Sequence, residues 1–289
     1  MNDFNYRRRH SSTVQIGNVP LGGDNPIRIQ SMTSTSTLDT DARVAHWRRV
    51  LDGGADYVRL TAQGVREAHN IGEIRAALHA AGYTKPLVAD IHFNPKAAFE
   101  AAATTDKVRI NPGNFVDAAR TFKKLEYTDE EYAAELEKIR RAVVPFLAIC
   151  REHHTAVRLG VNHGSLSDRI MSRYGDTPAG MVESAMEYLR IFREENFNDV
   201  AISIKASNTV IMVETVRRLV AEIAARYLAA SGSPASDAPK AQAGALSFHE
   251  LHQLTRQAIE HARLLQVPVV ISIVDAHGTE TVTWRMPDA

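Results

Sequence analysis

The sequence contains very little cysteine: Cys150 is the only one among 289 residues. A single thiol cannot form a disulfide within the chain, and alone it cannot supply the thiolates of an iron–sulfur cluster. Long apolar runs are also missing, since no stretch approaches the roughly 18 consecutive apolar residues of a membrane span. The basic stretch MNDFNYRRRHSS is not followed by an apolar segment, which argues against a secretory signal. We therefore expect a cytoplasmic protein that does not cross a membrane.

An excess of charge of either sign is absent as well. The 34 lysines and arginines balance 34 aspartates and glutamates, so neither a nucleic-acid surface nor an acidic tail is indicated. The G-x-G-x-x-G loop of dinucleotide-binding domains does not occur. The chain is long enough to bury a substantial core in one or two domains.

The stretch KVRINPGN, residues 107–114, carries the clearest functional pattern. Apolar residues alternate with Lys107, Arg109 and Asn111, which is the two-residue period of a strand. The Pro-Gly pair ends the strand, because proline lacks a backbone donor and glycine adopts angles that other residues avoid. Arg109 and Asn111 are therefore expected on one side at the carboxyl end of a strand, where a guanidinium and an amide suit a phosphate.

Strand, polar loop and helix alternate six times in the first 228 residues, after a predicted hairpin at 12–28. The expected strands are 27–32, 57–61, 86–93, 107–111, 156–161 and 199–205, and the expected helices are 39–53, 65–81, 94–104, 126–152, 181–196 and 208–227. This alternation is typical of an α/β fold with parallel strands. A barrel gathers the polar strand ends on one face, whereas an open doubly wound sheet spreads them apart. We therefore predict that residues 1–228 form an incomplete (β/α)8 TIM-like barrel of about six strand–helix units.

Positive side chains at the strand ends are the main sign of function. They are Arg59, Arg109, Arg158 and Lys205, each on a different predicted strand. Around one barrel mouth, with little acid nearby, they would bind a diphosphate or another polyanion, because forked guanidinium bonds to phosphate are strong and directional. The alternative is that each arginine pairs with a neighbouring carboxylate and holds the barrel together.

Further polar residues follow the same strands. Asp90 and His92 stand two apart on one strand, so they could form an acid–base pair or orient a substrate hydroxyl; alternatively, His92 is structural. No third ligand at suitable spacing completes a metal site with them. Asn162 is a candidate donor to a ligand, whereas Arg169 and Arg173 are expected in a loop, in surface ion pairs.

Eight motifs lie in register between about residue 11 and residue 227: QIGNVPLGG, QSMTSTST, GADYVRLT, PLVADIHF, KVRINPGNF, RLGVNHGSLSDRIMSRYGD, MVESA and SIKASN. Together they resemble the 4-hydroxy-3-methylbut-2-en-1-yl diphosphate synthase family, which comprises iron–sulfur oxidoreductases of non-mevalonate isoprenoid biosynthesis. The segments YTDEEYAAEL and NHGSLSDRIM resemble the larger-form branch of this family.

The resemblance implies a (β/α)8 barrel that binds 2-C-methyl-D-erythritol 2,4-cyclodiphosphate. The family opens this ring reductively to 4-hydroxy-3-methylbut-2-enyl diphosphate, with electrons from ferredoxin or flavodoxin. It implies a diphosphate grip by Arg59, Arg109, Arg158 and Lys205, further substrate contacts by Asn111, Asn162 and His92, and Asp90 beside them.

Several family features are missing from this sequence. The T-E-A-G motif of the seventh strand and the cluster cysteines do not occur, so the family implies a 4Fe–4S cluster whose ligands are absent from this chain. We therefore expect this chain to retain only substrate binding. The alternatives are a non-catalytic diphosphate-binding or interaction module from a gene fusion, and a pteroate-synthase-like barrel, against which the motif-by-motif match argues. An open barrel exposes two sheet edges, which predicts a poorly soluble or homo-oligomeric protein.

The remaining residues form a different kind of segment. Residues 229–245, AASGSPASDAPKAQAGA, are typical of a linker. Residues 246–289 predict a helix at 248–265 and strands at 267–274 and 280–285. They resemble the opening of the small α/β domain found at the end of some corrinoid adenosyltransferases and in haem-binding proteins. We interpret them as a partial α/β segment from a second family, because it is small for an independent core.

Overall fold

The computed structural model describes residues 11–32, 38–91, 94–117, 126–228, 270–274 and 280–285. Contacts between Cα atoms divide the chain into two units, residues 1–222 and 223–289. Each unit is described by itself.

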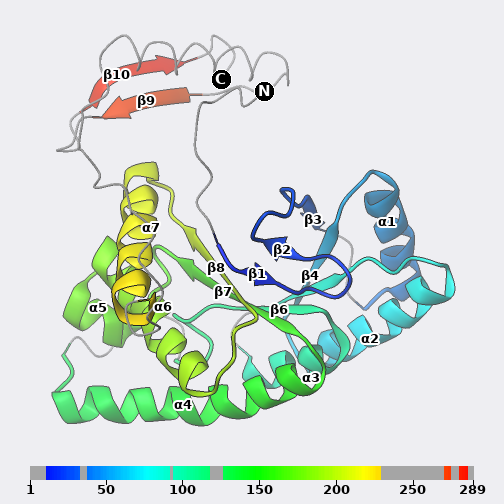
Figure 1. Ribbon diagram of the computed structural model, residues 1–289, viewed down its shortest axis with the longest axis horizontal. Helices are drawn as coiled ribbons and strands as arrows, with labels where there is room; N and C mark the ends of the chain where they lie inside the picture. The colour runs from blue at the N-terminus through cyan, green and yellow to red at the C-terminus, as the bar shows by residue number, and fades with distance from the viewer. Residues whose placement is uncertain are drawn as a thin grey trace. The chain divides into compact units, whose positions relative to one another are not determined.

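A six-stranded parallel sheet forms the framework of the first unit (Figure 1). Its strands are β3 (Gln30–Met32), β4 (Tyr57–Ala62), β5 (Leu87–Ile91), β6 (Lys107–Ile110), β7 (Ala156–Asn162) and β8 (Val200–Lys205). Their order in the sheet is their order in the chain. Right-handed crossovers then place every connecting helix on the same face, whereas a doubly wound sheet reverses its strand order. The predicted α/β fold, an incomplete TIM-like barrel, is therefore confirmed.

The helices lie in an outer arc around the strands (Figure 1). They are α1 (Thr40–Asp52), α2 (Val65–Ala80), α3 (Pro95–Thr104), α4 (Asp129–Glu152), α5 (Asp168–Tyr174), α6 (Pro178–Glu194) and α7 (Thr209–Ile223), which continues into a π-helical turn, η1 (Ala224–Leu228). Neighbours in this arc contact each other in the series α1–α2, α2–α3, α3–α4 and α4–α6. Such a series requires that these helices cover one face of the sheet.

Capping side chains fix where the helices begin. Asp39 accepts a hydrogen bond from the backbone of Ala42, and Thr128 forms a reciprocal capping box with Glu131. Helix α5 corrects an expectation, since residues 168–174 were expected to be a loop. Ser167 caps this helix, and its Ile170 is fully buried, so a short helix is stabilised there.

Side chains alternate between the two faces of the strands. In β4, Val58 and Leu60 are fully buried, while Arg59 and Thr61 on the opposite face are half-buried. Because the helices cover one face of the sheet, the apolar set packs against them, and the polar set faces inward. The polar strand ends predicted from the sequence thus lie on the inner face.

A short hairpin, β1 (Thr13–Val14) and β2 (Leu21–Gly22), covers the amino end of this inner face. Its apolar side chains cluster with Tyr57, Val88 and Ala156, which lie near the amino ends of their strands. The Tyr57 hydroxyl donates to the Val19 carbonyl at 2.8 Å. With the amino end closed by apolar packing, the opposite end holds the polar groups.

Strands β3 and β8 are the outermost strands of the described sheet. Ile27 and Ile29, beside β3, are 72% and 62% exposed. The described helices include none that is long and apolar enough to cross a membrane.

The described part of the second unit includes an antiparallel pair, β9 (Val270–Val274) and β10 (Glu280–Arg285), in which Val270 pairs with Arg285. Both strands were predicted. The helix predicted at 248–265 lies outside the described residues.

Candidate functional site

Two neighbouring rows of inward-facing residues cross the middle of the sheet. Strand register places Thr61, Asp90, Arg109 and Arg158 in one row. The adjacent row toward the amino end contains Arg59, Val88, Lys107 and Ala156. Three of the four cations predicted at the barrel mouth therefore belong to one continuous patch, which we call the inner cationic patch (Arg59, Lys107, Arg109 and Arg158).

Asp90 bridges two arginines of this patch. Its Oδ1 accepts from Arg109 Nη1 at 3.1 Å, and its Oδ2 lies 3.5 Å from Arg59 Nε. Asp90 and Arg109 are each 5% exposed. The expectation of little nearby acid is therefore wrong at this position, because one carboxylate holds two guanidinium groups in place.

Arg158 has no such partner among the described carboxylates. Its Nε donates to the Ser203 hydroxyl at 2.9 Å. Burial lowers the pKa of Arg158, and the charges of Arg109 and Arg59 lower it further. The charge of Asp90 acts in the opposite direction. A partly desolvated guanidinium with two like-charged neighbours is stabilised by an added anion.

Gly160 provides the space for Arg109. A Cβ at position 160 would lie 2.5 Å from Arg109 Nε, too close for any real side chain. The Gly160 carbonyl in turn accepts from Arg109 Nη2 at 3.2 Å. The glycine thus lets the guanidinium lie flat against the backbone of β7.

Lys107 belongs to the patch although the sequence analysis did not assign it to the site. It is 3% exposed, and its Nζ lies 4.6 Å from the centre of the Tyr57 ring. Burial lowers its pKa to about 8, with further contributions from the charges of Arg158 and Arg59. The signal was present in the sequence, because Lys107 shares the alternation of Arg109 and Asn111.

The loop after β6 is locked to the loop after β7. Asn111 Nδ2 donates to the Ser165 hydroxyl at 2.7 Å, and its Oδ1 accepts from the backbone of Gly113 at 3.1 Å. A Cβ on Gly113 would lie 1.8 Å from the Ser165 carbonyl oxygen, so only glycine fits. The Asn111 amide therefore joins the two loops at the rim of the site.

Two further predicted residues lie at the carboxyl ends of β7 and β8. Asn162 and Lys205 are register partners on β7 and β8, with Asn162 half-buried and Lys205 exposed. His92, predicted beside Asp90, lies outside the described residues. The acid–base role of Asp90 with His92 stays a prediction.

A second cluster contains Arg169, which was expected in a surface pair. Arg169 is 2% exposed, and its Nη1 donates to both oxygens of Glu187 at 2.7 and 2.8 Å. Its Nη2 donates to Asp117 at 3.1 Å, and the Tyr132 hydroxyl donates to Glu187. Burial opposes the charge of Arg169, but the two carboxylates more than reverse this and raise its pKa. The surface-pair expectation was wrong for Arg169, whereas Arg173 does pair with Asp129 in a more exposed position.

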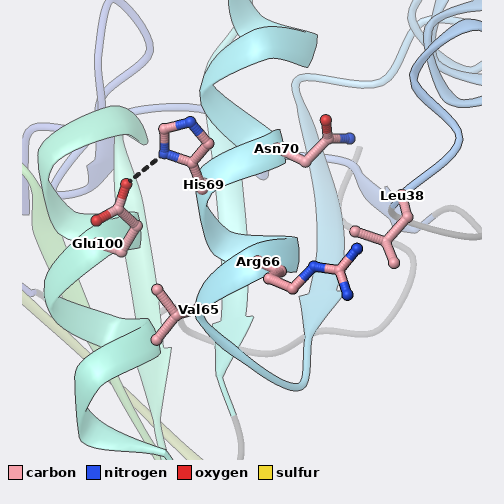
Figure 2. A pocket seen from close by; sticks show the side chains of 6 residues that line it. All are labelled: Leu38, Val65, Arg66, His69, Asn70 and Glu100. Carbon is pink, nitrogen blue, oxygen red and sulfur yellow. Dashed lines mark hydrogen bonds and ion pairs between the residues drawn. The ribbon is translucent and has the colours of Figure 1, made fainter.

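A cavity of about 360 Å³ lies away from the inner face, beside α2 and α3 (Figure 2). Its lining residues are Leu38, Val65, Arg66, His69, Asn70 and Glu100. His69 and Glu100 join the two helices through a 2.8 Å contact between Nδ1 and Oε1. No residue of the inner cationic patch lines this cavity, so it is separate from the candidate site.

The residues of this chain do not fit an iron–sulfur cluster. Cys150 is fully buried on α4, and burial raises the pKa of its thiol far above the usual value, which disfavours the thiolate form. Within the described part of the chain, no three His, Cys, Asp or Glu residues are grouped to hold a metal ion. No chemical step through a cluster is therefore assigned to this chain.

Comparison with protein families identifies residues 11–228 as a GcpE TIM-barrel domain. The chain belongs to the GcpE family. Its match covers all six strands of the sheet and every residue of the inner cationic patch. The GcpE barrel is thus the framework that carries the candidate site.

Relatives of this GcpE chain are named 4-hydroxy-3-methylbut-2-en-1-yl diphosphate synthase. The flavodoxin-type protein of Parabacteroides distasonis is 70% identical over 217 residues, covering 75% of this chain and 36% of that protein. The flavodoxin-type protein of Bacteroides thetaiotaomicron is 58% identical over 285 residues, covering 95% of this chain and 46% of that protein. The ferredoxin-type chloroplastic protein of rice, Oryza sativa subsp. japonica, is 51% identical over 220 residues, covering 76% of this chain and 30% of that protein.

The chain spans less than half the length of these relatives. The alignment that covers 95% of the chain necessarily extends past residue 228. The segment that resembles a second family therefore also aligns, for the most part, with a relative of the first.

Proposed function

We propose that this chain provides the substrate-binding barrel of a 4-hydroxy-3-methylbut-2-en-1-yl diphosphate synthase. The substrate is 2-C-methyl-D-erythritol 2,4-cyclodiphosphate, and Arg59, Arg109 and Arg158 bind its phosphate oxygens. The observation that supports this most directly is the inner cationic patch, which contains four cations and one carboxylate that contacts two of them, in a family whose members are named as synthases of a diphosphate.

The geometry supports different roles for these residues in binding the ligand. Asp90 orients Arg59 and Arg109, so their remaining N–H groups are held in fixed directions before a ligand arrives. Arg158 lacks a carboxylate partner within the described chain and gains most from a bound anion. Asn162 and Lys205 extend the site along the rim, and His92 stays a predicted substrate contact.

The reduction needs electrons that no assigned residue of this chain supplies. We propose that the whole protein uses the family's 4Fe–4S cluster, with ligands from outside this chain, and flavodoxin or ferredoxin as the donor. We further propose a cytoplasmic protein in which residues 229–245 link the barrel to a partial α/β segment, 246–289. Homo-oligomer formation would cover the outer strands and stays a prediction.

Isothermal titration calorimetry with the cyclodiphosphate tests this proposal. We expect one binding site per chain, with an affinity that falls as salt rises, because the attraction is ionic. The control is Arg141→Gln on the outer face of α4, where the side chain is 77% exposed, and it should leave the affinity unchanged. Absence of binding would refute the proposal.

A turnover assay separates the two forms of this function. The chain is mixed with cyclodiphosphate and a chemical reductant under anaerobic conditions, and the products are measured by mass spectrometry. Binding without product supports a binding barrel that depends on other residues for reduction. Formation of 4-hydroxy-3-methylbut-2-enyl diphosphate would show that the chain is catalytically complete.

A further inference from the structure

Among the described residues, Lys107 is a buried cation with no carboxylate in direct contact. It is 3% exposed, and none of the described carboxylates forms an ion pair with it. Burying an ammonium group in this way costs free energy unless something compensates for its charge. The Tyr57 ring, 4.6 Å from Nζ, compensates for part of it.

The position of Lys107 on β6 places it next to the candidate site. It lies two residues before Arg109 on the same face of β6, a separation of about 7 Å along a strand. In its own row, only Val88 separates it from Arg59. The apolar hairpin cluster around Tyr57, Val88 and Ala156 closes the other side. The ammonium is therefore part of the floor beneath the arginines.

Positive charges outnumber negative charges around Lys107. The groups that face it are Tyr57 and Arg59 on β4, Asp90 on β5, Arg109 on β6 and Arg158 on β7. Burial raises the pKa of Tyr57, so this phenol stays neutral at ordinary pH. Asp90 is thus the one carboxylate among these groups, and it already contacts two arginines.

We propose that Lys107 is a further anion-binding residue of the barrel, which interacts with the phosphate groups of the ligand from the floor of the site. This inference rests on the proposed function, because it assumes that the inner cationic patch binds a diphosphate. Its specific consequence is that ligand binding is coupled to the protonation of one lysine.

The coupling has a defined sign. In the free protein, burial and neighbouring cations hold the pKa of Lys107 at about 8. A bound dianion reverses the electrostatic part of that shift and favours the charged ammonium. Near pH 8.5 the free lysine is mostly neutral, so binding takes up a proton from solution; near pH 6.5 it is already charged, and no proton is taken up.

Proton uptake is measured by calorimetric titration in two buffers of different ionisation enthalpy. The probe is the cyclodiphosphate, in which each phosphorus carries one carbon ester and one P–O–P anhydride bond, so its single ionised oxygen does not titrate in this pH range. We expect an uptake of at least half a proton per site at pH 8.5 and almost none at pH 6.5. Binding with no uptake at pH 8.5 would overturn the inference and leave the proposed function intact.

Lys107→Met removes the charge and keeps an apolar stem against Tyr57. We expect this variant to bind the cyclodiphosphate about tenfold more weakly at pH 6.5 and to lose the uptake at pH 8.5. The matched control is Lys85→Met, at an exposed position just before β5. Unchanged affinity and unchanged uptake in Lys107→Met would refute the assignment, whereas absence of binding in the unmodified chain would refute the proposed function itself.

Discussion

Two arginines in this barrel, the buried Arg169 and the half-buried Arg158, have opposite surroundings. Arg169 contacts two carboxylates and lies against the Tyr132 ring, so its charge is fully compensated within the protein. Arg158 contacts a hydroxyl, and its closest charged neighbours include two other arginines. The difference shows which arginine holds the fold together and which one is available to a ligand, although the same side chain occurs in both.

The largest expected effect is on the compensated arginine. Arg169→Met would leave the buried Glu187 and the half-buried Asp117 without their counter-charge, and we expect a loss of about 3–5 kcal/mol in the free energy of unfolding. Urea denaturation followed by circular dichroism measures it. Arg173→Met is the control, because this partly exposed arginine should cost about 1 kcal/mol or less. Equal losses in the two variants would remove the distinction between the clusters.

Replacement of Arg158 should affect ligand affinity strongly and stability little, the opposite of what is expected for Arg169. Arg158→Gln relieves repulsion with Arg109 and Arg59, so stability should change by less than about 1 kcal/mol or rise. Its affinity for the cyclodiphosphate should fall by about 10- to 100-fold, since a charge-assisted hydrogen bond is lost. Calorimetry and urea denaturation of the same preparation test both parts. A strongly destabilised variant with unchanged affinity would contradict the comparison.

Replacement of Gly160 should lower both stability and affinity, because this uncharged residue determines where Arg109 can lie. Gly160→Ala introduces a Cβ 2.5 Å from Arg109 Nε, so the side chain must move, at a cost of about 1–3 kcal/mol in stability. The affinity for cyclodiphosphate should fall as well, because Arg109 is displaced from Asp90. Gly72→Ala within α2 is the control, since alanine is favoured in a helix and its Cβ meets only a Thr104 side chain at 3.2 Å.

The smallest effect is expected at the exposed pair on the outer helices. The hydrogen bond and charge of Glu100 raise the pKa of His69, so protonation favours the folded state. This stabilisation is fully present below the ordinary histidine pKa of about 6.5 and is lost as pH rises through the higher folded value. His69→Gln should therefore reduce the free energy of unfolding slightly more at pH 5.5 than at pH 8.5. An identical difference at both values would argue against a charged pair.

The strands and most helices could be predicted because each has a local signal. The alternation around Arg109 predicted its strand and the side on which Arg109 lies, and the helix expected at 126–152 is α4 (Asp129–Glu152). Pairing of the arginines could not be predicted in this way. Arg169 meets carboxylates 18 and 52 residues away, and no local pattern specifies which distant acid will reach it.

Some features of the candidate site could likewise be predicted from local patterns, and others could not. Period-two alternation brought Arg59, Arg109 and Arg158 to one face, and the structure has them there. That Lys107 and Arg59 occupy one row depends on the register between three strands, which the sequence does not encode locally. The bridge that Asp90 forms between two arginines likewise depends on contacts between neighbouring strands.

The order of the strands also has a consequence for biosynthesis. Each strand of the barrel pairs with the one synthesised immediately before it. The sheet can therefore grow by one strand–helix unit at a time as the polypeptide leaves the ribosome, without waiting for distant segments to arrive. At every stage the newest strand is the template for its successor, and the cationic lining accumulates gradually rather than being brought together in a single late step.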